Sequence, residues 1–399
     1  MKIPFYFDDP NDPYKFNGIN KKFRHVYYTD QTFSNNIPEY FHNSIQVVDS
    51  SYHNMYYYPI YASWQCYHYI SSFSISIPAS VLHDIKKNKC KILIFNTVEG
   101  FNLKFVENLI KEKIIISYKL NYDNFVTLTG NFDKLSPNGI KNIYFNSFED
   151  LIINYNLNID MFPEKIIDNL YSPKLKKHKF ICLQRRPKIQ RLMLFTELYK
   201  NKNDGILTMG VGDASLREID HLEENFFNSK TYKKYKKHQL RNVLPCEFDV
   251  NLEIENPVED FNIEKYLQSY LHIVSETFFE TNNNQLFFSE KIYKPIIFLQ
   301  PFIVFSQPYS LKKLQELGFK TFSSHYIDED YDNVIDNKKR FLFALGQVKK
   351  IISMSHTELH EMTKYFRETL LHNYYLLKFR NNNARDRLLI DLHDHLKYR

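Results

Sequence analysis

The chain has few cysteines and no long hydrophobic run. Only 4 of its 399 residues are cysteine, and none of them forms a CxxC pair. Cys90 and Cys182 lie in or beside apolar runs, which is typical of reduced, structural thiols in a cytosolic compartment. No apolar run reaches the roughly eighteen residues of a membrane-spanning helix, and the polar, acidic start of the chain does not match a signal peptide. We therefore expect a cytoplasmic protein without an integral membrane segment, in the host cytoplasm if the chain is viral.

Several motifs that identify enzyme classes are missing as well. The 15 histidines form no HExxH motif and no tight His/Cys metal spacing. Neither a GxSxG motif nor a P-loop is present. The net charge of +6 is modest for this length, so it permits phosphate-bearing partners without requiring them. The chain contains 30 Tyr and 34 Phe against 9 Gly, a bias that we attribute to an AT-rich genome.

The first part of the chain predicts an α/β domain. Apolar runs at residues 91–95, 125–128 and 141–145 are typical of buried parallel strands, and helical segments at 102–112 and 148–156 alternate with them. A further helix is predicted at 79–87, while residues 1–50 predict irregular structure or a short pairing segment. We place this domain at residues 1–176, with Pro163 and the basic run 174–179 marking a linker.

The second part predicts another α/β domain, at residues 177–379. Its predicted strands are 180–183, 205–209 and 270–275, and its predicted helices include 189–199, 310–317, 338–354 and 358–379. A short strand is predicted at 320–322. Residues 380–399 form a last amphipathic helix that we expect to pack back on the first domain. The expected fold is therefore α/β, with two Rossmann-like domains that face a cleft.

Residues 270–308 have the pattern of a βαβ unit. An apolar run ends at Ser275, a polar loop follows, and Ser289-Glu290-Lys291 opens a helix with a Ser N-cap and a carboxylate in the first turn. A second apolar run, 296–305, is interrupted by Pro301. In a doubly wound sheet such a helix N-terminus lies in the ligand crevice, where free N–H groups favour an anion.

This ordered set of residues resembles the nucleotide-sugar half of GT-B glycosyltransferases. It is most similar to the α1,3-fucosyltransferases and related phage and bacterial glycosyltransferases, which carry a strand with a Glu, a loop, [ST]-E-K, an apolar helix and a Pro-Phe-Ile/Val strand. The matching residues here are Glu276, Ser289, Glu290, Lys291, Lys294, Pro295 and Pro301-Phe302-Ile303. Arg191 stands where that family has a phosphate-binding Arg, whereas Gln184 replaces the family's Asn.

The resemblance implies how a nucleoside-diphosphate sugar would be bound. Departure of the diphosphate needs positive charge, which a metal or cationic side chains can supply, and GT-B enzymes use the latter. Arg191 and Lys291 are the predicted diphosphate ligands, with Arg185, Arg186 and Lys294 as further candidates. No metal and no cofactor beyond the donor substrate are expected.

The carboxylates have predicted roles too. Glu290 is expected to accept hydrogen bonds from hydroxyl groups of the ribose or the donor sugar, and Glu276 is expected to lie near the donor sugar. Inverting transfer needs a base from the first domain, for which Glu99, just after strand 91–95, is best placed. The segment 129–131 is a candidate lining of the acceptor site.

The predicted function is sugar transfer to a glycan, a protein or another hydroxyl acceptor. One alternative is glycosylation of DNA bases, supported by the basic run at 230–237; another is a non-catalytic nucleic-acid-binding protein that uses the same run. A metal-dependent GT-A enzyme would use Asp328 and Asp330 as a D-x-D motif. These residues lie in a late acidic loop, which favours a loop or helix-capping role.

Overall fold

A computed structural model of the chain describes residues 2–6, 44–48, 52, 54–61, 77–96, 103–132, 135–146, 149, 163–184, 188–210, 263–280 and 286–397. The chain divides into two compact units. Unit 1 contains Met1–Leu151, Asn283–Phe288 and Arg380–Arg399, and unit 2 contains Ile152–Asn282 and Ser289–Phe379. Glu99, Arg185, Arg186, the predicted helix 148–156 except Glu149, and the basic run 230–237 lie outside the described residues.

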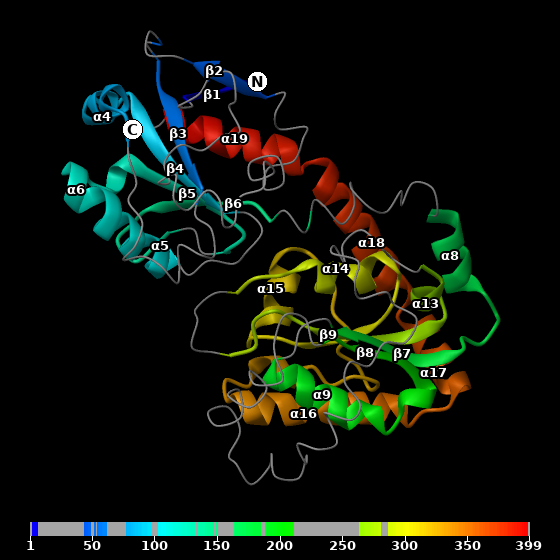
Figure 1. Cartoon of the computed structure of the whole chain (residues 1–399). Helices are drawn as coiled ribbons and strands as arrows, with labels where there is room; N and C mark the ends of the chain where they lie inside the picture. The colour runs from blue at the N-terminus through cyan, green and yellow to red at the C-terminus, as the bar shows by residue number, and fades with distance from the viewer. Residues whose placement is uncertain are drawn as a thin grey trace. The chain divides into compact units, whose positions relative to one another are not determined.

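Unit 1 contains a six-stranded sheet of order β2-β1-β3-β4-β5-β6, in which every pair is parallel (Figure 1). Its strands are β1 (Ile3–Tyr6), β2 (Ile45–Val48), β3 (Tyr56–Tyr61), β4 (Cys90–Asn96), β5 (Phe125–Thr129) and β6 (Lys141–Tyr144). Its helical segments are α4 (Ala79–Lys86), α5 (Leu103–Ile110), η2 (Lys111–Ile115), α6 (Ile116–Tyr118), η3 (Tyr122–Asn124) and α19 (Ala384–Lys397).

Alternate residues of these strands pack against helices on opposite faces of the sheet. Ile92 and Ile94 belong to the core that includes the buried residues of α4 and α5. Leu93 and Phe95 point to the other face, where they share a core with residues of α19. Tyr57 donates its hydroxyl hydrogen bond to the Leu392 carbonyl oxygen of α19, at 2.8 Å. The last helix of the chain thus completes the core of unit 1.

Unit 2 contains a four-stranded parallel sheet of order β10-β9-β7-β8. The strands are β7 (His178–Gln184), β8 (Gly205–Met209), β9 (Ser269–Ser275) and β10 (Phe302–Phe305). Figure 1 shows α9, α16 and α17 on one face and α13 and α14 on the other. The helical segments of this unit are α8 (Pro163–Tyr171), α9 (Ile189–Tyr199), η5 (Lys202–Asp204), α13 (Ile263–Leu267), α14 (Glu290–Ile297), α15 (Ser310–Glu316), η6 (Asp330–Asn333), α16 (Asn337–Ile352), α17 (His356–Tyr365) and α18 (Arg367–Asn382), which continues into unit 1.

The predicted mixed α/β fold with parallel sheets is confirmed. The strands expected at 91–95, 125–128, 180–183 and 205–209 lie within β4, β5, β7 and β8, and the helix expected at 189–199 is α9. Cys90 and Cys182 are buried free thiols. Gly318 ends the α15 turn with φ +95°, a conformation that its missing Cβ permits.

Four local predictions were wrong. Residues 320–322 form no strand, and the segment 358–379 is divided between α17 and α18. Pro163 opens α8 instead of a linker, because proline has no N–H to lose in the first helical turn. Only the last part of the apolar run 296–305 is a strand: α14 continues to Ile297, and Leu299 then takes a left-handed φ of 52°.

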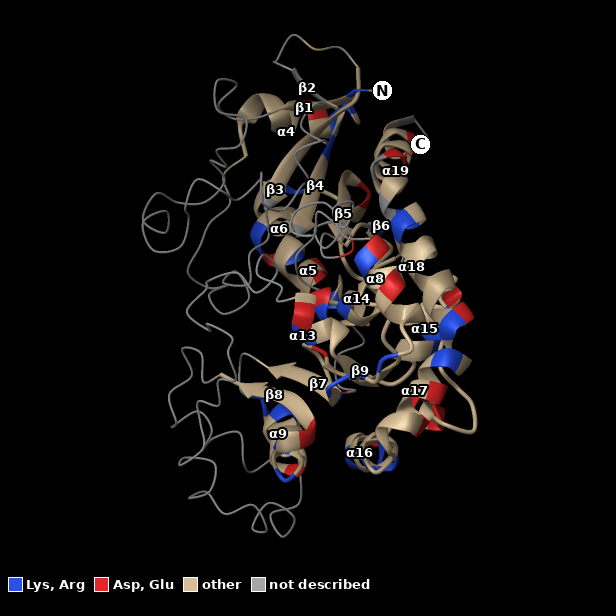
Figure 2. Ribbon diagram, turned by 90° about the vertical axis from the view of Figure 1, so that its right-hand side faces the viewer, with Lys and Arg blue, Asp and Glu red and all other residues tan. Residues whose placement is uncertain are grey.

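Charged residues among those described lie mainly on the helices, with acidic and basic residues interspersed (Figure 2). Among the described residues, no helix is both long and apolar enough to cross a membrane.

Candidate functional site

The carboxyl edge of the unit 2 sheet gathers most of the described candidate residues. Because β7, β8, β9 and β10 are parallel, their carboxyl ends meet at one edge, which is where ligands bind in open α/β sheets. Gln184 ends β7 and Ser275 ends β9. Glu276 follows β9 directly, and its backbone N–H donates to the carbonyl oxygen of Phe305 at the end of β10. The edge is therefore held together by the strands themselves.

Ser289 and Glu276 lock the beginning of α14 to the end of β9. The Ser289 hydroxyl donates to Oε2 of Glu276 at 2.6 Å, and the Ser289 backbone N–H lies 3.2 Å from Oε1. The Thr277 N–H also donates to Glu276 Oε2, at 3.1 Å. Ser289 is the predicted N-cap: its Oγ accepts from the backbone N–H of Lys291. Glu276 is fully buried, so its carboxylate positions the helix N-terminus.

Removing the Ser289 hydroxyl tests this lock. We expect Ser289→Ala to lower the free energy of unfolding by about 1–2 kcal/mol, because a cap is lost and a buried carboxylate oxygen loses a donor. Chemical denaturation measures the change. Ser353→Ala is the control, since Ser353 is exposed and a surface change stays within about 0.5 kcal/mol. An equal loss in both variants would contradict the lock.

Glu290, Lys291 and Lys294 form a charged cluster in the first turns of α14. Nζ of Lys291 lies 2.5 Å from Oε1 of Glu290. Burial alone would raise the pKa of Glu290, but the neighbouring Lys291 and Lys294 ammonium groups outweigh it and lower the pKa to about 2. Burial lowers the pKa of Lys294 to about 8, against the attraction of Glu290. Glu290 and Lys294 are therefore charged at neutral pH.

Arg191 reaches the same edge from the first turn of α9. It is buried, and its Nη2 donates to the carbonyl oxygens of Glu276 at 3.2 Å and Ser275 at 3.4 Å. Its guanidinium thus contacts the end of β9, next to the Glu276 residue that is bonded to the N-terminus of α14. The site contains three cationic side chains, Arg191, Lys291 and Lys294, and two carboxylates, Glu276 and Glu290. Burial raises the pKa of Glu276. The cluster carries a surplus of positive charge.

Two buried polar atoms at this edge have no hydrogen-bond partner among the described residues. These are Oε1 of Gln184 and Oγ of Ser275. The Gln184 amide nitrogen instead lies 3.2 Å from Sγ of Cys182. Unsatisfied buried groups are uncommon in folded proteins, and at a functional edge they are available to a ligand or an ordered water. Gln184 thus adds polar capacity to the site although it differs from the Asn of the resembling family.

The structure thus brings six of the predicted residues together in unit 2: Arg191, Glu276, Ser289, Glu290, Lys291 and Lys294. Glu99 and Arg185 lie outside the described residues, so their roles stay predictions, as does a contact of Glu276 with a donor sugar. In unit 1, the Thr129 hydroxyl donates to Asn142 Oδ1 at 2.9 Å, and the Asn142 amide donates to the Asn131 carbonyl at 2.9 Å. The segment 129–131 is therefore tied into a buried network.

Sequence reasoning missed two cations near the unit 2 edge. Lys188, just before α9, donates from Nζ to the Thr277 carbonyl at 2.6 Å. Arg340 of α16 is almost fully buried; it donates to the Ser306 carbonyl, 3.0 Å away, and stacks on the Phe279 ring at 4.5 Å. Lys188 follows Arg185 and Arg186, and that local basic run was its only signal. Nothing in the helical pattern of α16 marked Arg340 as a buried anchor.

The acidic segment 328–332 has structural roles. The Glu329 carboxylate accepts from the Phe322 N–H at 2.7 Å, and Asp328 accepts from the Asp330 N–H at 3.0 Å. Asp332 accepts from the N–H groups of Leu311 and Lys312 in the first turn of α15. These contacts are the loop and capping roles that the sequence favours. No group of three or more His, Cys, Asp or Glu within the described part of the chain is arranged to hold a metal.

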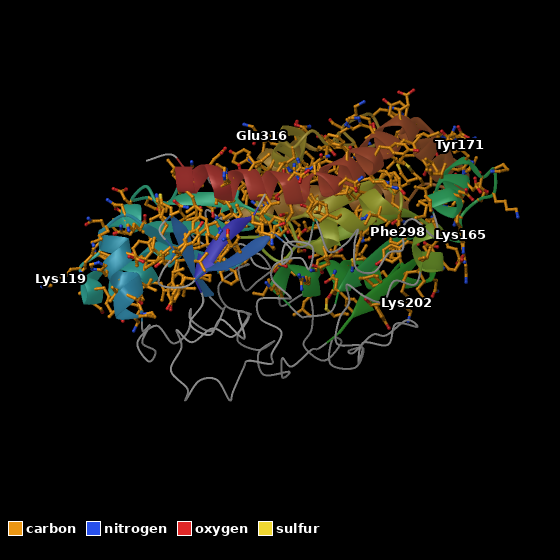
Figure 3. All side chains as sticks on the ribbon, turned by 90° about the horizontal axis from the view of Figure 1, so that it is seen from above. Lys119, Lys165, Tyr171, Lys202, Phe298 and Glu316 are labelled. Atoms are coloured by element: carbon orange, nitrogen blue, oxygen red, sulfur yellow. The ribbon has the colours of Figure 1, made fainter. Side chains whose placement is uncertain are left out.

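Aromatic stacking fixes the other end of α14. Phe298, labelled in Figure 3, lies face to face with Tyr266 of α13, with ring centroids 4.2 Å apart. The Gln300 amide then donates to the carbonyls of Tyr266 and Ser269 at 2.8 and 2.9 Å. Both ends of α14 are anchored, so its N-terminus is a rigid support for a ligand.

Comparisons with protein-family models, with curated proteins and with solved structures found no match to this chain.

Proposed function

We propose that unit 2 binds a nucleoside-diphosphate sugar at the carboxyl edge of its sheet and that the chain transfers the sugar to a hydroxyl acceptor. The observation that carries the proposal is the anchored N-terminus of α14, which presents Lys291 beside the ionised Glu290 and the buried Lys294. The helix dipole and the two ammonium groups together favour a diphosphate. Glu290 is suited to accept hydrogen bonds from sugar hydroxyl groups, because its low pKa keeps the carboxylate ionised at neutral pH.

The proposed roles follow from burial. The side chain of Lys291 is 23% exposed, so it is the cation that reaches a ligand most easily. Arg191 and Glu276 are more deeply buried, and they support the site through the end of β9 and through Ser289. Gln184 and Ser275 offer their unpartnered polar atoms to the same ligand. The residues nearest the ligand would thus be Lys291, Glu290 and Lys294.

The proposed reaction follows from the leaving group. The acceptor oxygen attacks the anomeric carbon, the bond from that carbon to the diphosphate oxygen breaks, and the nucleoside diphosphate leaves with the electron pair. The Lys291 and Lys294 ammonium groups stabilise the negative charge that develops on it. A base takes the acceptor proton, and Glu99 of unit 1 is the proposed base. Two α/β units with parallel sheets suit a GT-B enzyme, in which donor and acceptor sites lie on different domains.

A thermal-shift screen against UDP, GDP, dTDP and CMP sugars tests donor binding. Run in excess EDTA, the screen should show stabilisation by one of the nucleoside-diphosphate sugars, because protein cations supply the charge. Adenosine, which has the nucleoside but no phosphate, is the control and should not stabilise the protein. Stabilisation that appears only after a divalent metal is added would contradict the proposed metal-independent site. So would the absence of a shift with every donor.

A further inference from the structure

A second group of cations lies at the opposite, amino edge of the unit 2 sheet. It surrounds the buried ring of Tyr270, the second residue of β9. Nζ of Lys176 lies 5.7 Å from the centroid of this ring, and the imidazole centroids of His356 and His360 lie 6.1 and 6.4 Å from it. The Lys176 backbone N–H also donates to the Tyr270 hydroxyl at 2.9 Å. Three basic side chains from two parts of the chain are thus fixed around one ring.

Further cations extend this group, which we name the amino-edge cluster: Lys176, Lys177, His178, His356, His360 and Arg367. His178 begins β7 and pairs in register with Ser269, the first residue of β9. The carbonyl of Lys177 lies 3.3 Å from Nε2 of His356. Arg367 begins α18, and its guanidinium stacks 4.4 Å from the ring of Tyr171 at the end of α8, which Figure 3 labels.

The charges of the amino-edge cluster are poorly balanced. Burial, Lys177 and His356 together lower the pKa of His178, and burial lowers the pKa of Lys176 to about 8. The pKa of His360 is lowered by burial first and then by cations that include Lys364, Lys176 and Arg367. Glu361 opposes them at His360, but its carboxylate is already paired with Lys364 at 2.7 Å. Among the described residues, the carboxylate that acts on His360 is thus shared with Lys364, so positive charge is in excess around His360.

Two polar atoms of the cluster are also unpartnered. Nε of Arg367 and Nδ1 of His178 are buried and meet no hydrogen-bond partner among the described residues. A buried polar atom without a hydrogen-bond partner costs about 1–3 kcal/mol, so these two atoms indicate a ligand or an ordered water that binds from outside the chain. Lys176, His356, His360 and Arg367 are each only partly buried, so solvent and a small ligand reach them.

We propose that Lys176, His360 and Arg367 bind a phosphate dianion, as free phosphate or a phosphate monoester, at the amino edge of the unit 2 sheet. The planar guanidinium of Arg367 suits two phosphate oxygens, and Lys176 and the protonated His360 add point charges. This site lies at the opposite edge of the sheet from the Lys291 site, and it is independent of the proposed transferase function.

A dianion fits this cluster better than a phosphodiester. The facing groups are Lys176, Lys177 and His178 from the segment before and within β7, His356, His360, Glu361 and Lys364 from α17, and Arg367 from α18. Binding of a dianion favours the charged form of each histidine. The affinity for a ligand with a fixed charge of −2 therefore rises as pH falls from 8 to 6, because more of the histidines are protonated in the complex.

Calorimetric titration of the full chain with inorganic phosphate tests the site. The titration uses the Lys291→Ala background, so that the proposed donor site does not contribute. We expect saturable binding that falls about tenfold in His360→Gln and in Arg367→Gln, since each removes one charged hydrogen-bond donor. Lys339→Gln, which removes an exposed cation of α16, is the matched control and should bind phosphate as the background does.

Three further measurements make the result decisive. Sulfate, which stays a dianion, should bind more tightly at pH 6 than at pH 8 in the background, and this difference should be clearly smaller in His360→Gln, where only Lys176 and the other histidines still gain charge. Dimethyl phosphate at equal ionic strength should bind at least tenfold more weakly than phosphate. Arg367→Lys keeps the charge and should retain part of the affinity, which separates a lost ligand from a lost fold. Equal binding of dimethyl phosphate, or phosphate affinity unchanged in both His360→Gln and Arg367→Gln, would overturn the proposal.

Discussion

Replacing Lys291 with alanine will lower the affinity for a nucleoside diphosphate by about 10–100-fold, the equivalent of one charge-assisted hydrogen bond. The Lys291 side chain is partly exposed, and within the described part of the chain its ammonium group contacts Glu290 and Ser289. Its loss therefore removes a positive charge that would contact the ligand, without leaving a cavity in the core. Calorimetric titration with the nucleotide that gives the largest thermal shift measures the change.

Stability and a distant lysine provide the controls for this result. Lys291→Ala should lower the free energy of unfolding by about 1–2 kcal/mol and remain folded, because it removes one of the two cations beside the buried Glu290 carboxylate while Lys294 remains. Lys339→Ala, on the exposed side of α16, should keep full nucleotide affinity. If nucleotide binding is unchanged in Lys291→Ala, or falls equally in Lys339→Ala, the α14 N-terminus is not the diphosphate site.

The second large effect is on stability. Glu290→Gln should lower the free energy of unfolding by about 3 kcal/mol at pH 7, because it leaves Lys294 buried without its counter-charge. Glu290 and Lys294 are both more than nine-tenths buried, so water screens them weakly. Urea denaturation of the two proteins measures the difference. Glu316→Gln is the control, since Glu316 pairs with Lys313 at the surface and should lose less than about 1 kcal/mol.

The effect of Glu290 must also depend on pH. The pKa of Glu290 is lowered from its ordinary value of 4.5 to about 2 in the folded chain. The unfolded chain therefore binds the proton first, so the stability due to Glu290 is complete above pH 4.5 and is lost as pH falls toward 2. The difference between the two proteins should shrink over that window. A difference that stays constant from pH 5 to pH 3 would contradict an ionised, paired Glu290.

The sequence predicted the strands well because they are short apolar runs. Phe180 to Leu183 lies within β7 and Gly205 to Met209 is β8, and most residues of both segments are buried. Residues 320–322, Lys-Thr-Phe, were also predicted as a strand, yet they pair with no strand. Phe322 instead donates its N–H to Glu329, so a side chain supplies the acceptor that a neighbouring strand would have given. A run of three residues with a single apolar side chain is too short to predict a strand.

The candidate site was predictable where its signal is local. Ser289 precedes a helical pattern with a carboxylate in its first turn, which is an N-cap signature, and the structure shows that cap. The contact of Ser289 with Glu276 spans a loop, and the contacts of Arg191 with Ser275 and Glu276 join residues 84 and 85 positions apart in the sequence. Such contacts depend on strand order, which local periodicity does not contain. The amino-edge cluster escaped prediction for the same reason.

The most direct test of the proposed function is release of labelled sugar from the preferred nucleotide sugar in the presence of excess EDTA. The full chain should release or transfer the sugar without added metal, and Lys291→Ala should do so at least tenfold more slowly under the same conditions. Release that requires a divalent metal, or that proceeds equally fast in Lys291→Ala, would contradict a cationic diphosphate site at the N-terminus of α14.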